Sequence, residues 1–216
     1  MTRDHRAGVP VRCRYGERVV TRDRPLALLI DLDGVLRVFD SSLPAAIERR
    51  HGLPGGALMR SAFTWGRISP ALVGAETHAA WLESIVADLA PVAGGPELAR
   101  AAVDEWQADR GVVVPEVLDL IREVRAARIP VGLATNATDR LDADLDKLGL
   151  SHEFDVVVNS SVIGTYKPTK GFFDAACKAL QHPPALCLFV DDDDRHVRGA
   201  RAVSYTHLTL PTILRV

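Results

Sequence analysis

The feature that most restricts the fold is a short apolar run that ends in two carboxylates. Residues 26–36 read LALLIDLDGVL, so apolar residues lead directly to Asp31, and Asp33 follows one leucine later. A run this short and this apolar is typical of a strand covered on both faces. Because residues i and i+2 of a strand point the same way, Asp31 and Asp33 are predicted to project together from its carboxyl end. Open α/β sheets bind their ligands at that end.

From Pro115 onward, helical and strand patterns alternate along the sequence. Such alternation predicts right-handed βαβ crossovers and hence a parallel, Rossmann-like sheet, which makes the fold class α/β. Residues 41–113 are different: they are rich in alanine, helical in spacing and punctuated by Pro and Gly. We therefore predict a core of residues 25–40 and 114–202, interrupted after its first strand by a helical cap at 41–113. The expected later strands are 129–135, 153–160 and 185–191, and the expected helices are 115–127, 138–150, 169–180 and one from about Asp194.

The composition excludes several classes of protein. The chain is 47% hydrophobic and 25% charged, with a net charge of −2, which argues against binding to nucleic acid or a membrane surface. No apolar run is long enough for a membrane span, and no signal-peptide pattern is present, so we expect a cytoplasmic protein. Cys13, Cys177 and Cys187 lack metal-ligand spacing and are predicted to be thiols in a reducing compartment.

Four predicted strands lead to polar residues that suit one chemistry. Asp31 and Asp33 follow the first strand, Thr135 and Asn136 follow the second, Lys167 lies in the loop after the third, and Asp191 to Asp194 follow the fourth. The carboxyl ends of parallel strands meet at one edge, so these groups are expected to converge. A carboxylate cluster of this density needs a cation, and hard oxygen ligands favour Mg²⁺. The cation, Lys167 and Thr135 would then bind a phosphate.

The ordered set resembles the haloacid dehalogenase superfamily of aspartate-nucleophile hydrolases over Leu26 to about Ala202. The matching stretches are DLDGVL, LATNA, the lysine of TYKPTKGFF, and FVDDDD. The resemblance implies Asp31 as nucleophile and Asp33 as the acid/base residue that also offers a backbone carbonyl to Mg²⁺. It further implies that Thr135, with Asn136, binds phosphate, that Lys167 balances charge, and that Asp192 ligates Mg²⁺ directly with Asp191 in support.

One position departs from the family pattern, and several others have an ordinary structural interpretation. His196 stands where many relatives have Asn, and we interpret it as a helix-surface or supporting residue. Arg37 is a candidate contact for a substrate anion. Trp65, Trp81 and Trp106 are expected in the core of the cap, with Trp65 the one candidate for lining the site. Asp193 and Asp194 are predicted to cap the last helix. A solvated helix face is predicted to carry Asp139, Asp142, Asp144 and Asp146.

The leading hypothesis is a Mg²⁺-dependent phosphatase that acts on a small phosphorylated metabolite through an aspartyl-phosphate. A carboxylic acid at Asp33 favours a phosphatase over a dehalogenase, which lacks it in this family. The alternatives are a non-catalytic or dehalogenase-type member of the same superfamily and, more remotely, a receiver-like signalling domain. The order Asp-x-Asp, Thr, Lys, Asp-Asp and the helical insert disfavour the receiver. The sequence leaves the identity of the metabolite and the oligomeric state open.

Both ends of the chain look foreign to this fold. Residues 1–24 contain seven Arg and three acids without apolar periodicity, which indicates either a disordered basic tail or an over-extended gene start. At the other end, Val203 to Thr212 match a translation of the transposase mosaic-end adapter used in sequencing libraries. We therefore interpret residues 203–216 as adapter-derived and exclude them from the functional argument. Because the family sheet gains a further strand at this point, we expect 185–191 to be left at the sheet edge.

Resequencing the source gene tests this interpretation of the C-terminal segment. We expect the natural reading frame to diverge from the present sequence at about Val203. Natural DNA that encodes SYTHLTLPT without an adapter would contradict the prediction.

Overall fold

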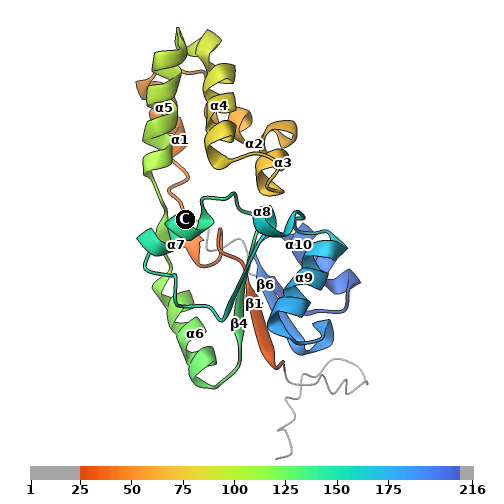
Figure 1. The fold of residues 1–216 in the computed structure, drawn as a ribbon. Coiled ribbons are helices and arrows are strands. Elements are labelled where there is room, and N and C mark those ends of the chain that lie inside the picture. Colours follow the sequence, from red (N-terminus) through yellow and green to blue (C-terminus); the bar gives the residue numbers. More distant parts are fainter. Residues whose placement is uncertain (1–24, 210–216) are drawn as a thin grey trace, which may run out of the picture.

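The computed structural model describes residues 25–209 of the chain and contains one five-stranded parallel sheet (Figure 1). The strand order is β5-β4-β1-β6-β7, so β1 is central and lies between β4 and β6. This order brings residues distant in sequence beside the end of β1, and it confirms the predicted α/β class. The strands are β1 (Ala27–Ile30), β4 (Val131–Thr135), β5 (Val156–Asn159), β6 (Cys187–Asp191) and β7 (Thr206–Thr209).

Helices cover both faces of the sheet (Figure 1). Leu28 and Ile30 of β1 pack into the apolar cluster that includes α6 and α7. Ala27 and Leu29 pack into the opposite cluster, with α9 and α10. This alternation explains why β1 is apolar along its whole length. The helices of the core are α6 (Pro115–Ala126), α7 (Leu141–Lys147), α8 (Ser160–Ile163), α9 (Lys170–Leu180) and α10 (Asp194–Ala202), and a 3₁₀ turn at Pro184–Leu186 precedes β6.

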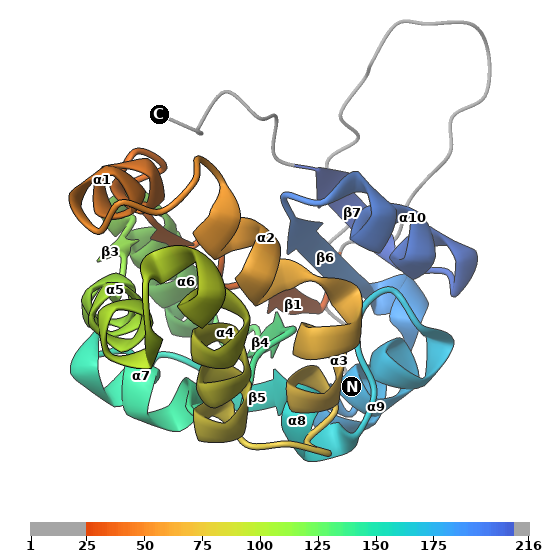
Figure 2. The ribbon, with the colours of Figure 1, turned by 90° about the horizontal axis from the view of Figure 1, so that it is seen from above.

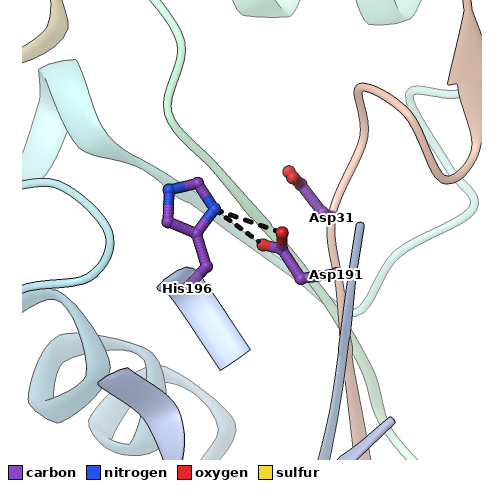
Figure 3. Close-up of side chains that lie close together, drawn as sticks. All are labelled: Asp31, Asp191 and His196. Carbon is purple, nitrogen blue, oxygen red and sulfur yellow. Dashed lines mark hydrogen bonds and ion pairs between the residues drawn. The ribbon is translucent and has the colours of Figure 1, made fainter. Parts of the chain in front are cut away.

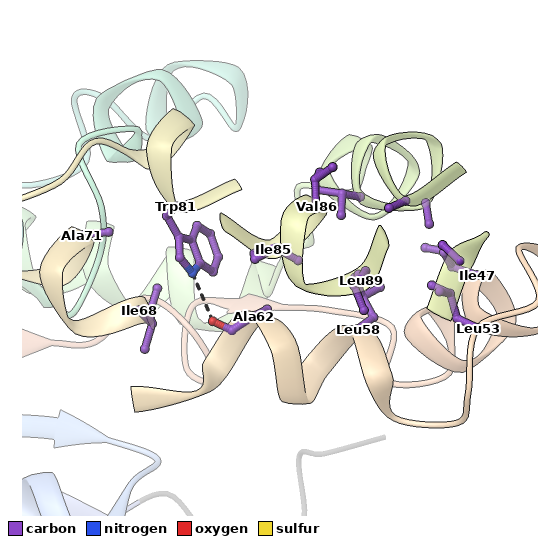
Figure 4. Close-up of a cluster of buried hydrophobic side chains, with 14 residues drawn as sticks. Ile47, Leu53, Leu58, Ala62, Ile68, Ala71, Trp81, Ile85, Val86 and Leu89 are labelled. Atoms are coloured by element: carbon purple, nitrogen blue, oxygen red, sulfur yellow. Dashed lines mark hydrogen bonds between the residues drawn. The ribbon is translucent and has the colours of Figure 1, made fainter. Parts of the chain in front are cut away.

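Five helices form an insert between β2 (Arg37–Val38) and β3 (Val112–Val113), which pair as an antiparallel stem. Seen from above, α2, α3 and α4 lie over the strand ends (Figure 2). The insert has an apolar core of its own, in which the Trp81 indole N–H donates to the Ala62 carbonyl oxygen at 3.0 Å (Figure 4). Its helices are α1 (Leu43–Arg50), α2 (Ala57–Phe63), α3 (Trp65–Leu72), α4 (His78–Ala93) and α5 (Pro96–Ala108).

The sequence patterns located each major core element but not the short ones. β4, β5 and β6 start two or three residues later than the predicted strands, and α7 is shorter than 138–150. The two-residue strands of the stem and the four-residue helix α8 were not predicted, because elements of this length show no periodicity. None of the helices in the described part of the chain combines the length and apolar character needed to cross a bilayer. Our interpretations of residues 1–24 and 210–216 fall outside the described residues.

The sheet edge at 185–191, which we expect to lack its natural neighbour, is covered by residues 206–209 of the segment that we interpret as adapter-derived, and we interpret this pairing as accidental. Backbone pairing joins Leu188 to Thr206 and continues to Asp191, so β7 satisfies the free edge of β6. Tyr205, just before β7, is buried against Phe173 and Phe189, and its hydroxyl donates to the Phe173 carbonyl oxygen at 2.9 Å. An unpaired strand edge accepts any extended segment of suitable polarity, and this is the physical reason why residues 206–209 pair there.

Two substitutions at Tyr205 test whether the segment of Tyr205 and β7 packs against the rest of the sheet. Tyr205→Ala removes a buried ring and is expected to lower the free energy of unfolding by about 3–5 kcal/mol. Tyr205→Phe removes only the hydroxyl contacts and should cost about 1 kcal/mol. Urea denaturation measures both changes. Wild-type stability in both variants would show that the segment does not pack on the sheet.

Candidate active site

The first element of the site is a tight turn that directly follows β1. β1 ends at Ile30, and the Asp31 backbone N–H still donates to the Val190 carbonyl oxygen at 3.0 Å. The Leu32 carbonyl then accepts from the backbone N–H groups of Leu36 and Arg37, at 2.9 and 2.7 Å. Asp31 and Asp33 therefore lie in a turn rather than on a continuous strand, and their carboxylates contact different partners.

Gly34 is required in this turn for two reasons. Its φ of +82° lies in the left-handed region, which side chains rarely adopt. A Cβ at this position would also overlap the carboxylate of Asp192. Asp192 thus lies directly against the turn that carries Asp31 and Asp33, where the sequence prediction placed it.

Lys167 is the buried centre of the site. Its Nζ lies 2.8 Å from Asp31 Oδ1 and 2.7 Å from Asp191 Oδ2, and the side chain is inaccessible to solvent. Asn136 holds the Lys167 backbone, because its Oδ1 accepts from the Lys167 N–H at 2.8 Å and its Nδ2 donates to the Lys167 carbonyl at 3.0 Å. The predicted phosphate ligand Asn136 therefore uses its amide to position Lys167.

The charges of Asp31, Lys167 and Asp191 partly offset the effect of burial on their pKa values. Burial, the largest influence, raises the pKa of Asp31 to about 7, although the attraction of Lys167 opposes the rise. Burial alone would lower the pKa of Lys167, but Asp31 and Asp191 outweigh it and raise that pKa. For Asp191, burial is outweighed by the hydrogen bond from His196 and the charge of Lys167, so its pKa is lowered.

His196 joins this cluster from α10 (Figure 3). Its Nδ1 lies 3.1 and 3.2 Å from the two carboxylate oxygens of Asp191, which also accepts from the Asp193 backbone N–H at 2.8 Å. The supporting role predicted for His196 agrees with this position. Asp193 caps α10 by accepting from the Arg195 N–H, and Asp194 lies in the first turn, as predicted.

The donor set fits a hard divalent cation. Ligand atoms of Asp31, Asp191 and His196 lie within 4.8 Å of one another (Figure 3), and Asp192 of the predicted set lies against the same turn. The carboxylates of Asp31, Asp33, Asp191 and Asp192 gather around the turn, and Lys167 and Arg37 contact three of them. Oxygen-rich ligands of this kind suit Mg²⁺.

Arg37 contacts acids of the protein in this structure rather than an open anion site. It is buried and makes a two-point contact with Asp33, with Nε to Oδ1 at 2.6 Å and Nη2 to Oδ2 at 3.0 Å. Its Nη1 donates to Asp144 Oδ2 at 3.3 Å. Asp144 is 7% exposed and also pairs with Arg110 and Arg140, so its prediction as part of a solvated helix face was wrong. Helical periodicity could not reveal its burial, because Arg37 and Arg110 come from distant segments, although Arg140 is only four residues away.

A cleft of about 840 Å³ lies between the insert and the sheet edge and is lined by both. Asp33, Arg37 and Asn136 line its core side, and Thr135 is buried at the end of β4 beside it. Trp65 lines the cleft as the sequence suggested. Trp81 and Trp106 belong to the apolar core of the insert as predicted, and they also border the cleft. His78, which the sequence analysis did not select, also lines the cleft, and its Nδ1 lies 3.0 Å from Thr138 Oγ1.

Fold and site together define an α/β enzyme core whose acidic strand ends face a helical insert. A family model described as haloacid dehalogenase-like hydrolase matches residues 26–204. The chain belongs to this family, which confirms the resemblance and makes the protein a hydrolase.

Two curated relatives illustrate the similarity. Phosphatase MT3486 of Mycobacterium tuberculosis (strain CDC 1551 / Oshkosh) is 30% identical over 188 residues, which cover 81% of this chain and 82% of the relative. Phosphoserine phosphatase of Thermus thermophilus is 32% identical over 146 residues, which cover 63% of this chain and 58% of that protein.

Solved structures share the fold. The HAD family enzyme bt-2542 of Bacteroides thetaiotaomicron, in complex with magnesium and inorganic phosphate, has a TM-score of 0.67 at 21% identity, covering 85% of this chain and 92% of that one. The L-2-haloacid dehalogenase of Xanthobacter autotrophicus has a TM-score of 0.62 at 22% identity, covering 86% and 77%.

Replacement of Lys167 tests the electrostatic account of the site. Lys167→Met leaves two buried carboxylates without their shared cation and should lower the free energy of unfolding by about 3–5 kcal/mol at pH 7. The loss should shrink slightly at pH 5, because the pKa of Asp31 is about 7 beside Lys167 and rises further without it, so the carboxyl is protonated at pH 5 in both proteins. Denaturant titrations at both pH values measure the effect.

Lys170→Met is the matched control, since Lys170 is an exposed lysine paired with Asp174. It should change stability by less than about 0.5 kcal/mol at either pH. Equal losses in the two variants would contradict the role assigned to Lys167.

Proposed function

We propose that the protein is a Mg²⁺-dependent phosphatase that hydrolyses a small phosphorylated metabolite through an aspartyl-phosphate on Asp31. The observation that carries this proposal is the contact of Lys167 with both Asp31 and Asp191 at the end of β1. It sets a cation against the buried carboxyl of Asp31 and so favours its ionised form, which is the form a nucleophile needs toward an anionic phosphate. The phosphatase names of curated relatives support the same reaction.

Two carboxylates divide the chemistry. Asp31 attacks phosphorus, the ester oxygen leaves, and Asp33 supplies the proton to that oxygen. In the second step, Asp33 takes a proton from the water that attacks the phosphorylated Asp31. Asp33 lies in the turn after β1 and makes a two-point contact with Arg37 in this structure.

The remaining residues bind and orient. We assign Thr135, at the end of β4, to the phosphate, with Lys167 neutralising one of its oxygens. Asp31, Asp191 and Asp192 would hold Mg²⁺, together with the backbone carbonyl of Asp33. When bound, the ion supplies positive charge to the phosphate and to the crowded carboxylates. The insert, residues 41–113, acts in this proposal as a cap that excludes water and selects the substrate.

Dehalogenase chemistry is the competing reaction within the family. Structural neighbours include L-2-haloacid dehalogenases, but at 20–22% identity they establish the fold alone. Asp33 argues for the phosphatase, because halide is released without a proton whereas an alkoxide needs one. Asp33 lies in the same turn as Asp31, contacts Arg37 and lines the cleft.

Substitution of the proposed nucleophile tests the function. With p-nitrophenyl phosphate and Mg²⁺, the wild type should release phosphate, and EDTA should abolish the release until Mg²⁺ is restored. Asp31→Asn should reduce kcat by at least about 10³-fold, because an amide is a poor nucleophile. Circular dichroism should show an unchanged fold.

Asp142→Asn, an exposed acid on α7, is the matched control and should retain wild-type kcat. Retention of more than about 5% of kcat by Asp31→Asn would contradict the covalent route, given the losses that follow removal of a nucleophile. Release of chloride from 2-chloropropionate in place of phosphate would favour the dehalogenase.

A further inference from the structure

The insert side of the cleft is an aromatic wall made by Phe63, Trp65, Trp81 and Trp106, and we use this term for these four residues. The cleft volume of about 840 Å³ far exceeds what a phosphate ester of a few carbon atoms fills. Cavities of about 300–1,000 Å³ with apolar walls and few polar groups hold drug-sized organic ligands. The organic part of the substrate is therefore expected to be large.

Three rings of the aromatic wall are fixed by mutual contact. The centroids of Phe63, Trp81 and Trp106 are 6.0–6.2 Å apart in tilted or edge-to-face arrangements. The hydrogen bond from Trp81 to the Ala62 carbonyl fixes the indole further (Figure 4). A rigid set of rings loses little entropy when a flat ligand stacks on it.

Packing within the protein does not account for the whole wall. Phe63 and Trp65 each remain 54% exposed, although large aromatic rings of a folded chain are generally covered. The Trp65 ring lies 5.0 Å from the ring of Tyr166, the residue before Lys167. Exposed aromatic surface thus begins next to the proposed reaction centre and continues into the cleft, which is the expected position for a ligand.

The cations that line the cleft in the described part of the chain already have carboxylate partners. Arg37 pairs with Asp33 and Asp144, Arg140 pairs with Asp144, and Arg195 pairs with Asp193. A substrate that carried a carboxylate or a second phosphate would have to displace one of these pairs.

His78 adds no positive charge to the cleft at neutral pH. Burial, and then the charge of Arg140, lower the pKa of His78 to about 4, so its imidazole is neutral at pH 7. Acids such as Asp40 and Asp109 also line the cleft, so it disfavours a further negative charge on the organic part of the substrate.

We propose that the substrate is a phosphate monoester whose alcohol part carries an uncharged, flat aromatic or heteroaromatic ring system. The inference deepens the phosphatase function proposed above and rests on it for the phosphate. The ring stacks on the aromatic wall while the phosphate reaches Asp31 and Lys167. Esters of small carboxylic acids or sugars leave the wall in contact with water and are poor substrates.

Two esters that have similar leaving groups, and hence similar intrinsic reactivity, test the proposal by comparison of their kcat/KM values. 2-(4-Nitrophenyl)ethyl phosphate and ethyl phosphate both release a primary alcohol, so their kcat/KM ratio reports recognition of the ring. Stacking on aromatic side chains predicts a ratio of about 10–100 in favour of the aromatic ester. Trp65→Ala should lower this ratio about tenfold.

Leu98→Ala is the matched control for this experiment. Leu98 belongs to α5 of the insert, is 54% exposed like Trp65, and lies outside the lining of the cleft. Its replacement should leave the ratio unchanged. A wild-type ratio near one, or equal ratios in the wild type and Trp65→Ala, would overturn the aromatic site.

A binding measurement separates this inference from the phosphatase function. The chain has three tryptophans, and all of them line the cleft, so intrinsic fluorescence reports on the aromatic wall. 4-Nitrobenzylphosphonate should quench this fluorescence saturably, and methylphosphonate should not. Quenching without turnover of either ester would overturn the phosphatase function and support the aromatic site. Turnover of ethyl phosphate without quenching would support the phosphatase and overturn the aromatic site.

Discussion

The rest of the site depends on the contact of one buried ammonium group with two buried carboxylates. Asp31 follows β1 and Asp191 ends β6, and these strands are neighbours in the sheet. The two acids would repel each other in the low-dielectric interior without a cation. Lys167 supplies that cation from a third segment, and Asn136, after β4, holds its backbone. The ends of β1 and β6 and the loop that carries Lys167 are therefore held together by charge as well as by backbone hydrogen bonds.

The same arrangement recurs a short distance away in a more exposed form. Arg37 contacts Asp33 and Asp144 as Lys167 contacts Asp31 and Asp191, so in each case one cation joins two acids. The difference lies in solvent access, because the Asp33 side chain is 45% exposed whereas Asp191 is fully buried. Lys167 is therefore enclosed by its partners, whereas Asp33 lines the cleft and can meet a ligand there.

Sequence patterns predicted what depends on local periodicity. The apolar run before Asp31 and the alternation after Pro115 were sufficient for a parallel sheet with polar groups at one edge. They did not predict that Arg37 and Arg110 contact Asp144, since these contacts join segments that lie far apart in the sequence. The aromatic wall was missed for a similar reason. Helical spacing marks Trp81 and Trp106 as apolar, but only the packing of the insert shows which part of each ring faces the cleft.

The stem of the insert has a mechanical consequence. β2 and β3 are two residues long, and the chain enters and leaves the five helices through this narrow pair. Arg37 belongs to β2, and its guanidinium contacts Asp33. The Arg37 backbone N–H also donates to the Leu32 carbonyl, and the Arg37 carbonyl accepts from the Gly34 N–H, so the first strand of the stem is tied to the turn that carries Asp31 and Asp33. The insert is therefore anchored, where the chain enters it, to the acidic turn itself rather than to a separate linker.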